Sequence, residues 1–323
     1  MIKLKTIKKI LKILIKFFFY KKLNLFLEKQ NYLIIFRYGN AIGDHICLTG
    51  VISKIYNKNL KIIIFSNYIE FFLHNPKVHK TFNLKKKINR IIFLKLLGIF
   101  EGERIKSYRS KINDTTDEFF MKFFPKDIHF GLSHANHFNI TMNKSIFKNE
   151  IFFSKKEIEY YDKKFNLPNK FAVIHSEAKQ SLTSNKNWGP KRIQNIVDNL
   201  RNIKWIQVGK KGEYELKNTF KNYDNISLRE LGYILSKSEF LVSMEGMFNH
   251  YASAFDKKNF LIHLGFMTME SIYYPNNLVI HKNFDLKCYP CFSFKCKNHL
   301  ELCENELTSE YAVKFIKNEL RIN

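Results

Sequence analysis

Short apolar runs rich in β-branched and aromatic residues, each followed by a turn and a helical pattern, recur in two groups along this chain. In the first group, Tyr32–Phe36 precedes a glycine-containing turn and a helix expected from Asp44 to about Tyr56, and Leu60–Phe65 follows as a second strand. Strands that alternate with helices are typical of parallel sheets with helices on their faces. The sequence therefore predicts that a Rossmann-like domain begins near residue 30.

The second group begins at Phe171–His175 and repeats the same alternation. Helices are expected near Pro190–Leu200 and after the capping-box pattern Ser227-Leu-Arg-Glu230, and strands at Ile203–Val208, Glu239–Ser243 and Asn259–Leu264. A chain of 323 residues is also long for a single core. We predict an α/β protein with two Rossmann-like domains facing across a cleft: a basic leader over 1–28, an N-terminal domain over 29–157 and a C-terminal domain over 158–323.

The chain is strongly basic, with 54 Lys and Arg against 29 Asp and Glu and a net charge of +25. This charge favours an anionic partner, which can be nucleic acid, a phospholipid surface or a phosphorylated substrate. Because the lysines are spread along the whole chain, charge alone does not choose among the three. The alternative of a basic nucleic-acid-binding protein predicts tight, salt-sensitive oligonucleotide binding, but it leaves the ordered loop motifs unexplained.

The first residues form a cationic and apolar segment. Lysines 5, 8, 9, 12 and 16 fall on one side of a helical wheel, and Ile7, Leu11, Leu14 and Phe18 fall on the other. Such a helix can lie on anionic lipid or dock on the protein's own domain. Lysines interrupt every apolar run, so the segment is neither a membrane span nor a signal peptide. We expect a cytoplasmic protein that is peripheral on the inner face of the cytoplasmic membrane.

Ligands of open parallel sheets bind at the carboxyl ends of the strands, so the loops at those ends hold the candidate residues. Arg37, Gly39, Gly43 and Asp44 lie between the first strand and its helix. The glycines allow close backbone approach to a ligand. Asp44 can be a helix N-cap, which is a common role for Asp, or an ionised base that accepts a proton from a substrate hydroxyl. Local sequence leaves both roles open.

Two loops of the second domain have the same placement. Lys186 lies between a strand and a helix, where it can reach phosphates near the helix N-terminus, or it can be a solvated lysine. The turn from Glu245 through Gly246 and Met247 to His250 precedes another helix, whose N-terminus can hold a diphosphate while Glu245 or His250 contacts sugar or phosphate. A lone His is also often structural.

Four of the five cysteines lie close together in the sequence: Cys288, Cys291, Cys296 and Cys303. Their C-x2-C-x4-C-x6-C spacing is compact enough for structural zinc or an iron–sulfur cluster, although it is not that of a standard zinc finger. The other interpretation is a set of reduced structural thiols, and in a cytosolic setting disulfides are disfavoured.

The order of these pieces resembles glycosyltransferase family 9, which includes the lipopolysaccharide heptosyltransferases. Four segments between about residues 31 and 315 carry the resemblance, and the cysteines resemble a cluster near the end of many members. The segments are Arg37-Tyr-Gly-Asn-Ala-Ile-Gly-Asp44-His-Ile-Cys-Leu-Thr49, Lys186-Asn-Trp188, Ser227-Leu-Arg-Glu-Leu231 and Ser243-Met-Glu-Gly-Met-Phe-Asn-His250-Tyr-Ala252. Two departures are Glu245, where Asp is more usual, and His175-Ser-Glu, which replaces an H-P-G loop.

The resemblance implies a fold of the glycosyltransferase B type, a nucleotide-sugar donor, inversion at the anomeric carbon and no required metal. It assigns Asp44 as the base and Lys186 as the lysine on the donor phosphate. It makes the N-terminal domain over 29–157 the acceptor side and the C-terminal domain over 158–323 the nucleotide-sugar-binding side. Within the latter it places Gly246 to His250 in the donor-binding turn and Glu213 near the nucleotide ribose. The expected reaction moves a sugar, heptose from ADP-heptose in the first instance, to an anionic lipopolysaccharide or lipooligosaccharide core or a related surface glycan. A nucleotide-sugar epimerase on the same fold is the alternative enzyme.

Overall fold

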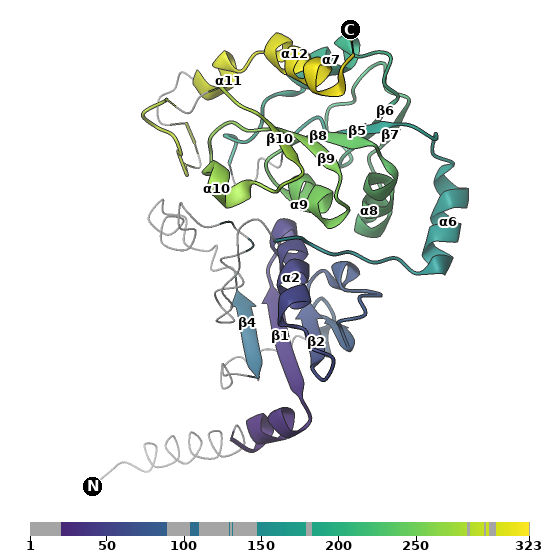
Figure 1. Ribbon diagram of the computed structural model, residues 1–323, viewed down its shortest axis with the longest axis vertical. Coiled ribbons are helices and arrows are strands. Elements are labelled where there is room, and N and C mark those ends of the chain that lie inside the picture. The colour runs from purple at the N-terminus through teal and green to yellow at the C-terminus, as the bar shows by residue number, and fades with distance from the viewer. Residues whose placement is uncertain are drawn as a thin grey trace.

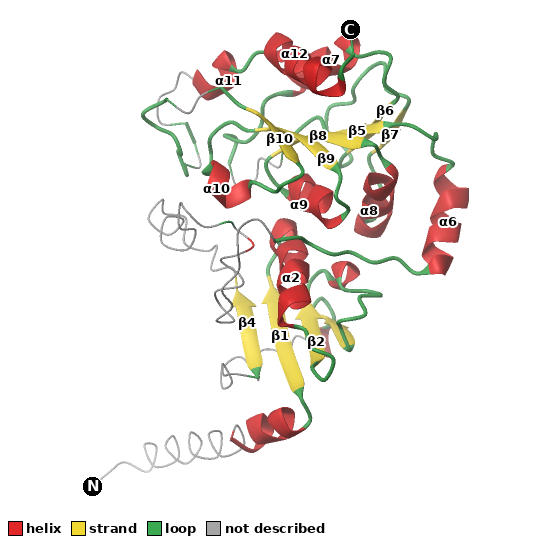
Figure 2. Ribbon diagram, viewed as in Figure 1, coloured by secondary structure: helices red, strands yellow, loops and turns green. Residues whose placement is uncertain are grey.

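The computed structural model describes residues 21–88, 104–109, 129, 131, 147–178, 183–282, 285–293, 295–296 and 302–322. Two sheets, each made of parallel strands, lie one above the other in the view of Figure 1. Helices pack on both faces of the upper sheet (Figure 2). The lysine-rich leader up to Phe18 and the ambiguous segment Ile91–Phe100 lie outside the described residues. Both predicted α/β units are present, one around each sheet.

The first sheet has the strand order β3-β2-β1-β4, with all neighbouring strands parallel. Its strands are β1 (Tyr32–Tyr38), β2 (Lys61–Ser66), β3 (Lys80–Asn83) and β4 (Ile105–Arg109). Helix α2 (Ile42–Ile55) lies between β1 and β2 in the sequence, and the short 3₁₀ helix η1 (Ile69–Phe71) lies between β2 and β3. The connection from β1 through α2 to β2 is the predicted β–α–β unit. The strand order reverses direction at β1, since β2 and β4 lie on its two sides.

Strand β1 shows why both faces of this sheet are covered. Leu33 and Ile35 pack in the core beneath α2, whereas Phe36 faces the opposite side, because successive side chains of a strand point to opposite faces. On that opposite side Phe36 packs with Leu27, which belongs to a helix over residues 21–29. The end of the leader is thus fixed to the first sheet by its own apolar residues.

The second sheet has the order β10-β9-β8-β5-β6-β7, again parallel throughout. Its strands are β5 (Ala172–Ile174), β6 (Trp205–Val208), β7 (Lys221–Tyr223), β8 (Phe240–Met244), β9 (Lys258–Ile262) and β10 (Asn277–Ile280). Numbered from β5, this is the 3-2-1-4-5-6 arrangement of dinucleotide-binding domains, in which ligands bind where the order reverses. The reversal lies between β5 and β8.

Helices cover both faces of the second sheet. On one side α7 (Pro190–Asn199) packs with α12 (Ser309–Leu320), and on the side that faces the first domain lie α8 (Leu228–Lys237) and α9 (Met247–Ala254) (Figure 1). The short helices α10 (Met269–Ile272) and α11 (Leu302–Glu306) complete this part. None of the helices in the described part of the chain is long and apolar enough to cross a bilayer.

The two domains are joined by a long strap and by direct packing. The strap contains α6 (Lys155–Phe165), which begins at a capping box formed by Ser154 and Glu157. Direct packing is made by α2 against α9, and one hydrophobic cluster includes side chains from both domains. Arg229 of α8 adds polar contacts, because it donates to the carbonyl oxygens of Glu70 at 3.0 Å and Phe152 at 2.7 Å.

The expected elements agree with the structure to within a few residues, and the Ser227–Glu230 capping box is present at the start of α8. Sequence patterns did not identify the short or half-buried strands β3, β4, β7 and β10. The charged run that begins at Lys155, at the predicted boundary between the two domains, forms helix α6. Its apolar residues Tyr161 and Phe165 are buried on one side of that helix, which gives it a reason to be ordered.

Candidate active site

The loops that leave the two reversal points of the sheets meet between the domains. The loop after β1 leads to Asp44 near the start of α2, the loop after β5 carries Lys186, and the turn after β8 carries Glu245. Helices α2 and α9, which follow two of these loops, face each other across the domain interface (Figure 1). Parallel-sheet topology therefore brings the predicted residues to one place.

Asp44 is paired with Arg37 and does not cap its helix. The N-cap position of α2 is Ala41, without a side-chain capping bond, and Asp44 lies in the first turn. Its carboxylate accepts a hydrogen bond from the Arg37 guanidinium, and the arginine side chain is only 1% exposed. The N-cap interpretation of Asp44 is therefore wrong, because the buried guanidinium at the end of β1 offers a stronger partner than the orphan backbone amides.

Lys186 acts electrostatically on the same carboxylate from the other domain. Burial raises the pKa of Asp44 above its ordinary value, and Arg37 and Lys186 oppose this shift without cancelling it. A carboxylate with a raised pKa is a better proton acceptor once it is ionised. The pKa of Asp44 therefore depends on one positive charge from each domain.

Lys186 has two defined neighbours in the second domain. Its Nζ lies 3.7 Å from Glu245 Oε2 and 4.3 Å from the centre of the Phe266 ring. The other oxygen of Glu245, Oε1, lies 2.5 Å from Nδ1 of His263. Burial acts to raise the pKa of Glu245, but His263 and Lys186 outweigh it and hold that pKa below its usual value. Glu245 is therefore an ionised carboxylate buried beside Lys186.

His250 lies on the contact between α9 and α2. Its Nδ1 lies 2.7 Å from the Tyr274 hydroxyl and 3.4 Å from the Cys47 sulfur. The opposite edge of the ring faces Gly43, where an added Cβ would lie only 2.6 Å from His250 Cδ2. Burial lowers the pKa of His250 to about 3, so this histidine is neutral at pH 7. In this conformation His250 bridges the domains, and Gly43 gives it room.

Glu213 belongs to a neighbouring pocket at the carboxyl end of β6. Its Oε2 accepts a hydrogen bond from the Lys210 amide at 2.9 Å and lies 4.0 Å from His175 Nε2. The pocket has a volume of about 330 Å³. It is lined by Gln207, Gly209, Lys210, Lys211, Gly212, Glu213, Glu215, Asn222 and Asp224. His175 packs against Phe248 of α9 with ring centres 4.2 Å apart, so this pocket adjoins the helix that begins after Gly246.

Two of the predicted loop glycines have backbone angles that favour glycine. Gly39 has φ of 123° in the turn after β1, and Gly246 has φ of 142° at the N-cap of α9. Met247 follows as the first residue of α9 and is partly exposed.

The four clustered cysteines lie beside the Lys186 loop. Asn185 contacts Cys291 Sγ at 3.6 Å and donates to the Ser293 carbonyl at 2.9 Å. All four are free thiols, and burial together with Cys291 and Cys296 raises the pKa of Cys303 to about 11. Over the part of the chain that the structure describes, no group of three His, Cys, Asp or Glu residues has an arrangement that could hold a metal ion.

Several site residues were not identified from the sequence. His263 follows β9, Asn149 precedes the strap, and Tyr274 follows α10. Asn149 donates to the Tyr274 hydroxyl at 3.1 Å and to the His250 carbonyl at 3.1 Å, which ties the start of the strap to the second domain. Only His263 left a sequence signal, because it lies near the end of the predicted strand Asn259–Leu264.

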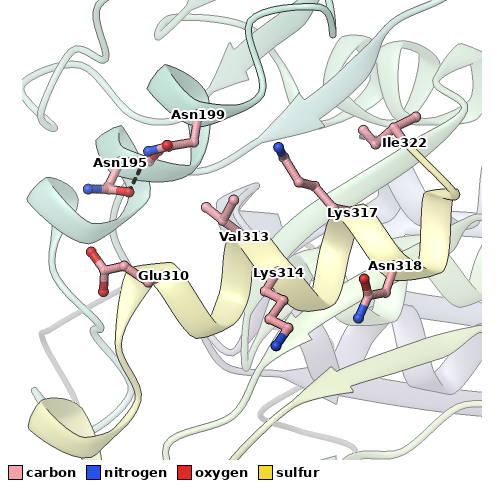
Figure 3. Close-up of a pocket in the computed structure, with 8 residues that line it drawn as sticks. All are labelled: Asn195, Asn199, Glu310, Val313, Lys314, Lys317, Asn318 and Ile322. Carbon is pink, nitrogen blue, oxygen red and sulfur yellow. Dashed lines mark hydrogen bonds between the residues drawn. The ribbon is translucent and has the colours of Figure 1, made fainter.

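A further groove lies far from these residues, between α7 and α12 (Figure 3). It has a volume of about 580 Å³ and is lined by Asn195, Asn199, Glu310, Val313, Lys314, Lys317, Asn318 and Ile322. Within it Asn199 donates to Asn195, so its polar groups are partly paired with one another. It does not contain any of the predicted site residues.

Several solved glycosyltransferase structures are similar to this one. A family 9 glycosyl transferase from Veillonella parvula aligns with a TM-score of 0.64 at 12% identity, covering 90% of this chain and 98% of that one. ADP-heptose LPS heptosyltransferase II from E. coli gives 0.63 at 10% identity, with coverage of 90% and 98%. The dodecameric iron-containing heptosyltransferase TibC, in complex with ADP-D-β-D-heptose, gives 0.61 at 13% identity, with coverage of 90% and 77%.

The chain has the fold of these glycosyltransferases. The expected fold of the glycosyltransferase B type, with two Rossmann-like domains, is thereby confirmed. No protein-family model matches the sequence, and no curated protein matches it either.

Proposed function

We propose that this protein is an inverting glycosyltransferase that transfers a sugar from a nucleotide-sugar donor to an acceptor hydroxyl without a catalytic metal. The donor we propose is ADP-heptose, and the acceptor is a lipopolysaccharide or lipooligosaccharide core or a related surface glycan. The observation that carries the proposal is the packing of α2 against α9, which brings the strand-end loops of Asp44 and of Glu245 with its neighbour Lys186 to the same domain interface. The charge of Lys186 also acts to lower the pKa of Asp44, against the effect of burial. The similar heptosyltransferase structures, one of them bound to ADP-heptose, support the choice of donor.

The proposed chemistry uses these two residues for opposite charges. Asp44 removes the proton of the acceptor hydroxyl while the oxygen forms its bond to the anomeric carbon, and the bond between that carbon and the diphosphate oxygen breaks. The leaving nucleoside diphosphate carries away the electron pair. Lys186 and the first amides of α9, which begins at Met247, offset its negative charge.

The test is a donor screen with released nucleotide diphosphate as the readout, with and without acceptor. Asp44→Asn is preferred to Asp44→Ala, since Asn keeps a polar partner for the buried Arg37 guanidinium, whose isolation would cost about 3–5 kcal/mol. We expect Asp44→Asn to lower kcat by about 100-fold or more at nearly unchanged donor affinity. Near-normal turnover would rule out the base assignment. Conversion of the sugar nucleotide without acceptor would favour the epimerase.

We further propose that the protein works at the inner face of the cytoplasmic membrane. The helix over residues 21–29 buries Leu27 against the first sheet but leaves Leu25 and Phe26 57% and 56% exposed. Lys21 and Lys29 are exposed on the same short helix. Apolar side chains next to lysines fit an anionic lipid surface, and such a surface would hold the enzyme beside a membrane-bound acceptor.

The metal at the four cysteines is a separate proposal with a direct test. Burial and the nearby Cys291 and Cys296 raise the pKa of the Cys303 thiol, and a bound cation would lower that pKa. In the described conformation these thiols do not form a metal-binding arrangement, so binding would require them to move closer together. A solved structure of similar fold is described as iron-containing. Elemental analysis of protein purified without chelators should find about one zinc or iron per chain, or an iron–sulfur cluster, and Cys291→Ser should remove it. Metal-free protein with full activity would establish reduced thiols instead.

A further inference from the structure

Four neighbouring strands of the second sheet each place a titratable residue at their carboxyl end. His281 follows β10, His263 follows β9, Glu245 follows β8 and His175 follows β5. The sequence singled out only Glu245 and the His175 loop. The other two, His263 and His281, are in direct contact within this layer of strand-end residues: His281 Nδ1 donates to the His263 carbonyl at 2.8 Å, and their rings lie 4.7 Å apart.

Within this layer His263 fixes the orientation of Glu245. Both side chains are almost completely buried, at 0% and 1% exposed. An ionised carboxylate only accepts hydrogen bonds, so the 2.5 Å contact between His263 Nδ1 and Glu245 Oε1 has the imidazole as donor. With Oε1 occupied in this way, Oε2 faces Lys186 Nζ at 3.7 Å. The geometry of the pair therefore determines where the lysine finds its counter-charge.

The loop that carries His263 also supplies the second contact of Lys186. Phe266 lies three residues beyond His263, and its ring lies 4.3 Å from Lys186 Nζ. A cation over an aromatic face is attracted to it. The ammonium group is thus placed between a carboxylate after β8 and an aromatic ring after β9, and His263 connects these two segments.

We propose that His263, acting through Glu245, is a positioning residue for Lys186 and sets how tightly the site holds the diphosphate of the donor. This inference rests on the proposed function, because the diphosphate is the ligand that Lys186 is proposed to meet. A side chain as long and flexible as lysine loses much rotamer freedom when it binds. A lysine held beforehand by a carboxylate and a ring has already lost part of that freedom, so it binds an anion more tightly than a mobile one.

The experiment measures binding of ADP by calorimetry and, separately, transfer kinetics with the donor found in the screen. UDP and GDP are titrated as well, and the diphosphate that binds the wild-type protein most tightly is used throughout. His263→Leu is expected to raise the dissociation constant about tenfold, with an unchanged binding stoichiometry. His263→Asn, whose amide nitrogen can donate from near the position of Nδ1, should restore affinity to within about threefold of wild type.

Coupling to the lysine is the decisive measurement. In a Lys186→Ala background, His263→Leu should change affinity less than about twofold, because its effect passes through Lys186. Ser243→Ala is the matched control, since it removes a buried 2.9 Å hydrogen bond from Ser243 to Asn259 between the same two strands without altering charge near Lys186. It should leave the dissociation constant unchanged.

The outcomes separate this inference from the proposed function. If His263→Leu binds the diphosphate like wild type, or weakens binding equally with and without Lys186, the positioning role is overturned while the transferase proposal stands. A fall in stoichiometry at constant affinity, together with a lower melting temperature, would mean that His263 only stabilises the fold, which also overturns the role. If wild type binds none of the three diphosphates and transfers no sugar, the proposed function itself fails.

Discussion

Gly43 offers the sharpest test of how the two domains fit together. A Cβ added at this position would lie 2.6 Å from Cδ2 and 3.0 Å from Nε2 of His250. Carbon atoms in van der Waals contact are about 3.5–4.0 Å apart, so the methyl group of Gly43→Ala would be roughly 1 Å too close. His250 cannot simply turn away, because its Nδ1 lies 2.7 Å from the Tyr274 hydroxyl.

Gly43→Ala must therefore shift the contact between α2 and α9 or break the His250–Tyr274 hydrogen bond. Overpacking of this kind costs about 1–3 kcal/mol of unfolding free energy, and loss of the hydrogen bond about 1 kcal/mol. The assay is urea-induced unfolding together with the melting temperature, for the single variants and the double variant. The wild-type glycine should be clearly the most stable choice as long as His250 is present.

The background His250→Ala supplies the control. With the imidazole gone, the methyl group has space, and an alanine in a helix is favoured over glycine by up to about 1 kcal/mol. Gly43→Ala should then be neutral or slightly stabilising, which reverses the sign seen in the wild type. A Gly43→Ala protein as stable as wild type, or the same loss of stability in both backgrounds, would show that close packing of Gly43 against His250 does not limit the domain contact.

Three further predictions concern charge and surface. Because burial raises the pKa of Asp44, kcat/KM should fall as pH drops through a value above that of an ordinary aspartate, and a pH–rate profile with no acidic limb above pH 4 would contradict the base role. Burial lowers the pKa of His45, His175 and His250 to about 3, whereas an unfolded histidine titrates near ~6.5. The unfolded state therefore binds the extra protons, and the free energy of unfolding falls as pH drops below about 6.5, by up to roughly 4 kcal/mol per pH unit for the three histidines together. Urea unfolding at pH 7 and pH 5 should show this loss, and equal stability at both pH values would be inconsistent with neutral buried imidazole rings. Finally, replacing exposed Leu25 and Phe26 by serine should reduce sedimentation with anionic vesicles while leaving the melting temperature unchanged, and unchanged sedimentation would remove that helix from the proposed membrane contact.

The sequence was sufficient to predict those parts of the fold that depend on local periodicity. The strands β1 and β2 and the helix between them follow from apolar runs and a glycine turn, and the start of α8 follows from one capping box. Strands such as β7, with three residues and no fully buried side chain, left no such pattern. Pairing with β6 makes it a strand, and this tertiary contact cannot be inferred from Lys221–Tyr223 alone.

The sequence predicted which residues belong to the candidate site better than it predicted the contacts between them. Topology alone placed Asp44, Lys186 and Glu245 at strand ends that face the same cleft. Arg37 was predicted as a loop residue beside Asp44, but its pairing with that carboxylate was not, because in a chain of this charge nothing in the sequence distinguishes a buried, paired arginine from a solvated one. His263 was missed for a related reason, since its importance lies in a contact between two strands that are neighbours only after the sheet has formed.

The hydrophobic cluster that includes side chains from both domains limits what either half of the protein can do alone. Phe71 of η1 packs edge-on against Tyr251 of α9, with ring centres 5.7 Å apart, although the two helices belong to different domains. Severing the chain in the strap would expose these rings to water in both fragments. Fragments with such patches tend to aggregate or to find each other again, so the two halves should be soluble when produced together and poorly soluble when produced apart.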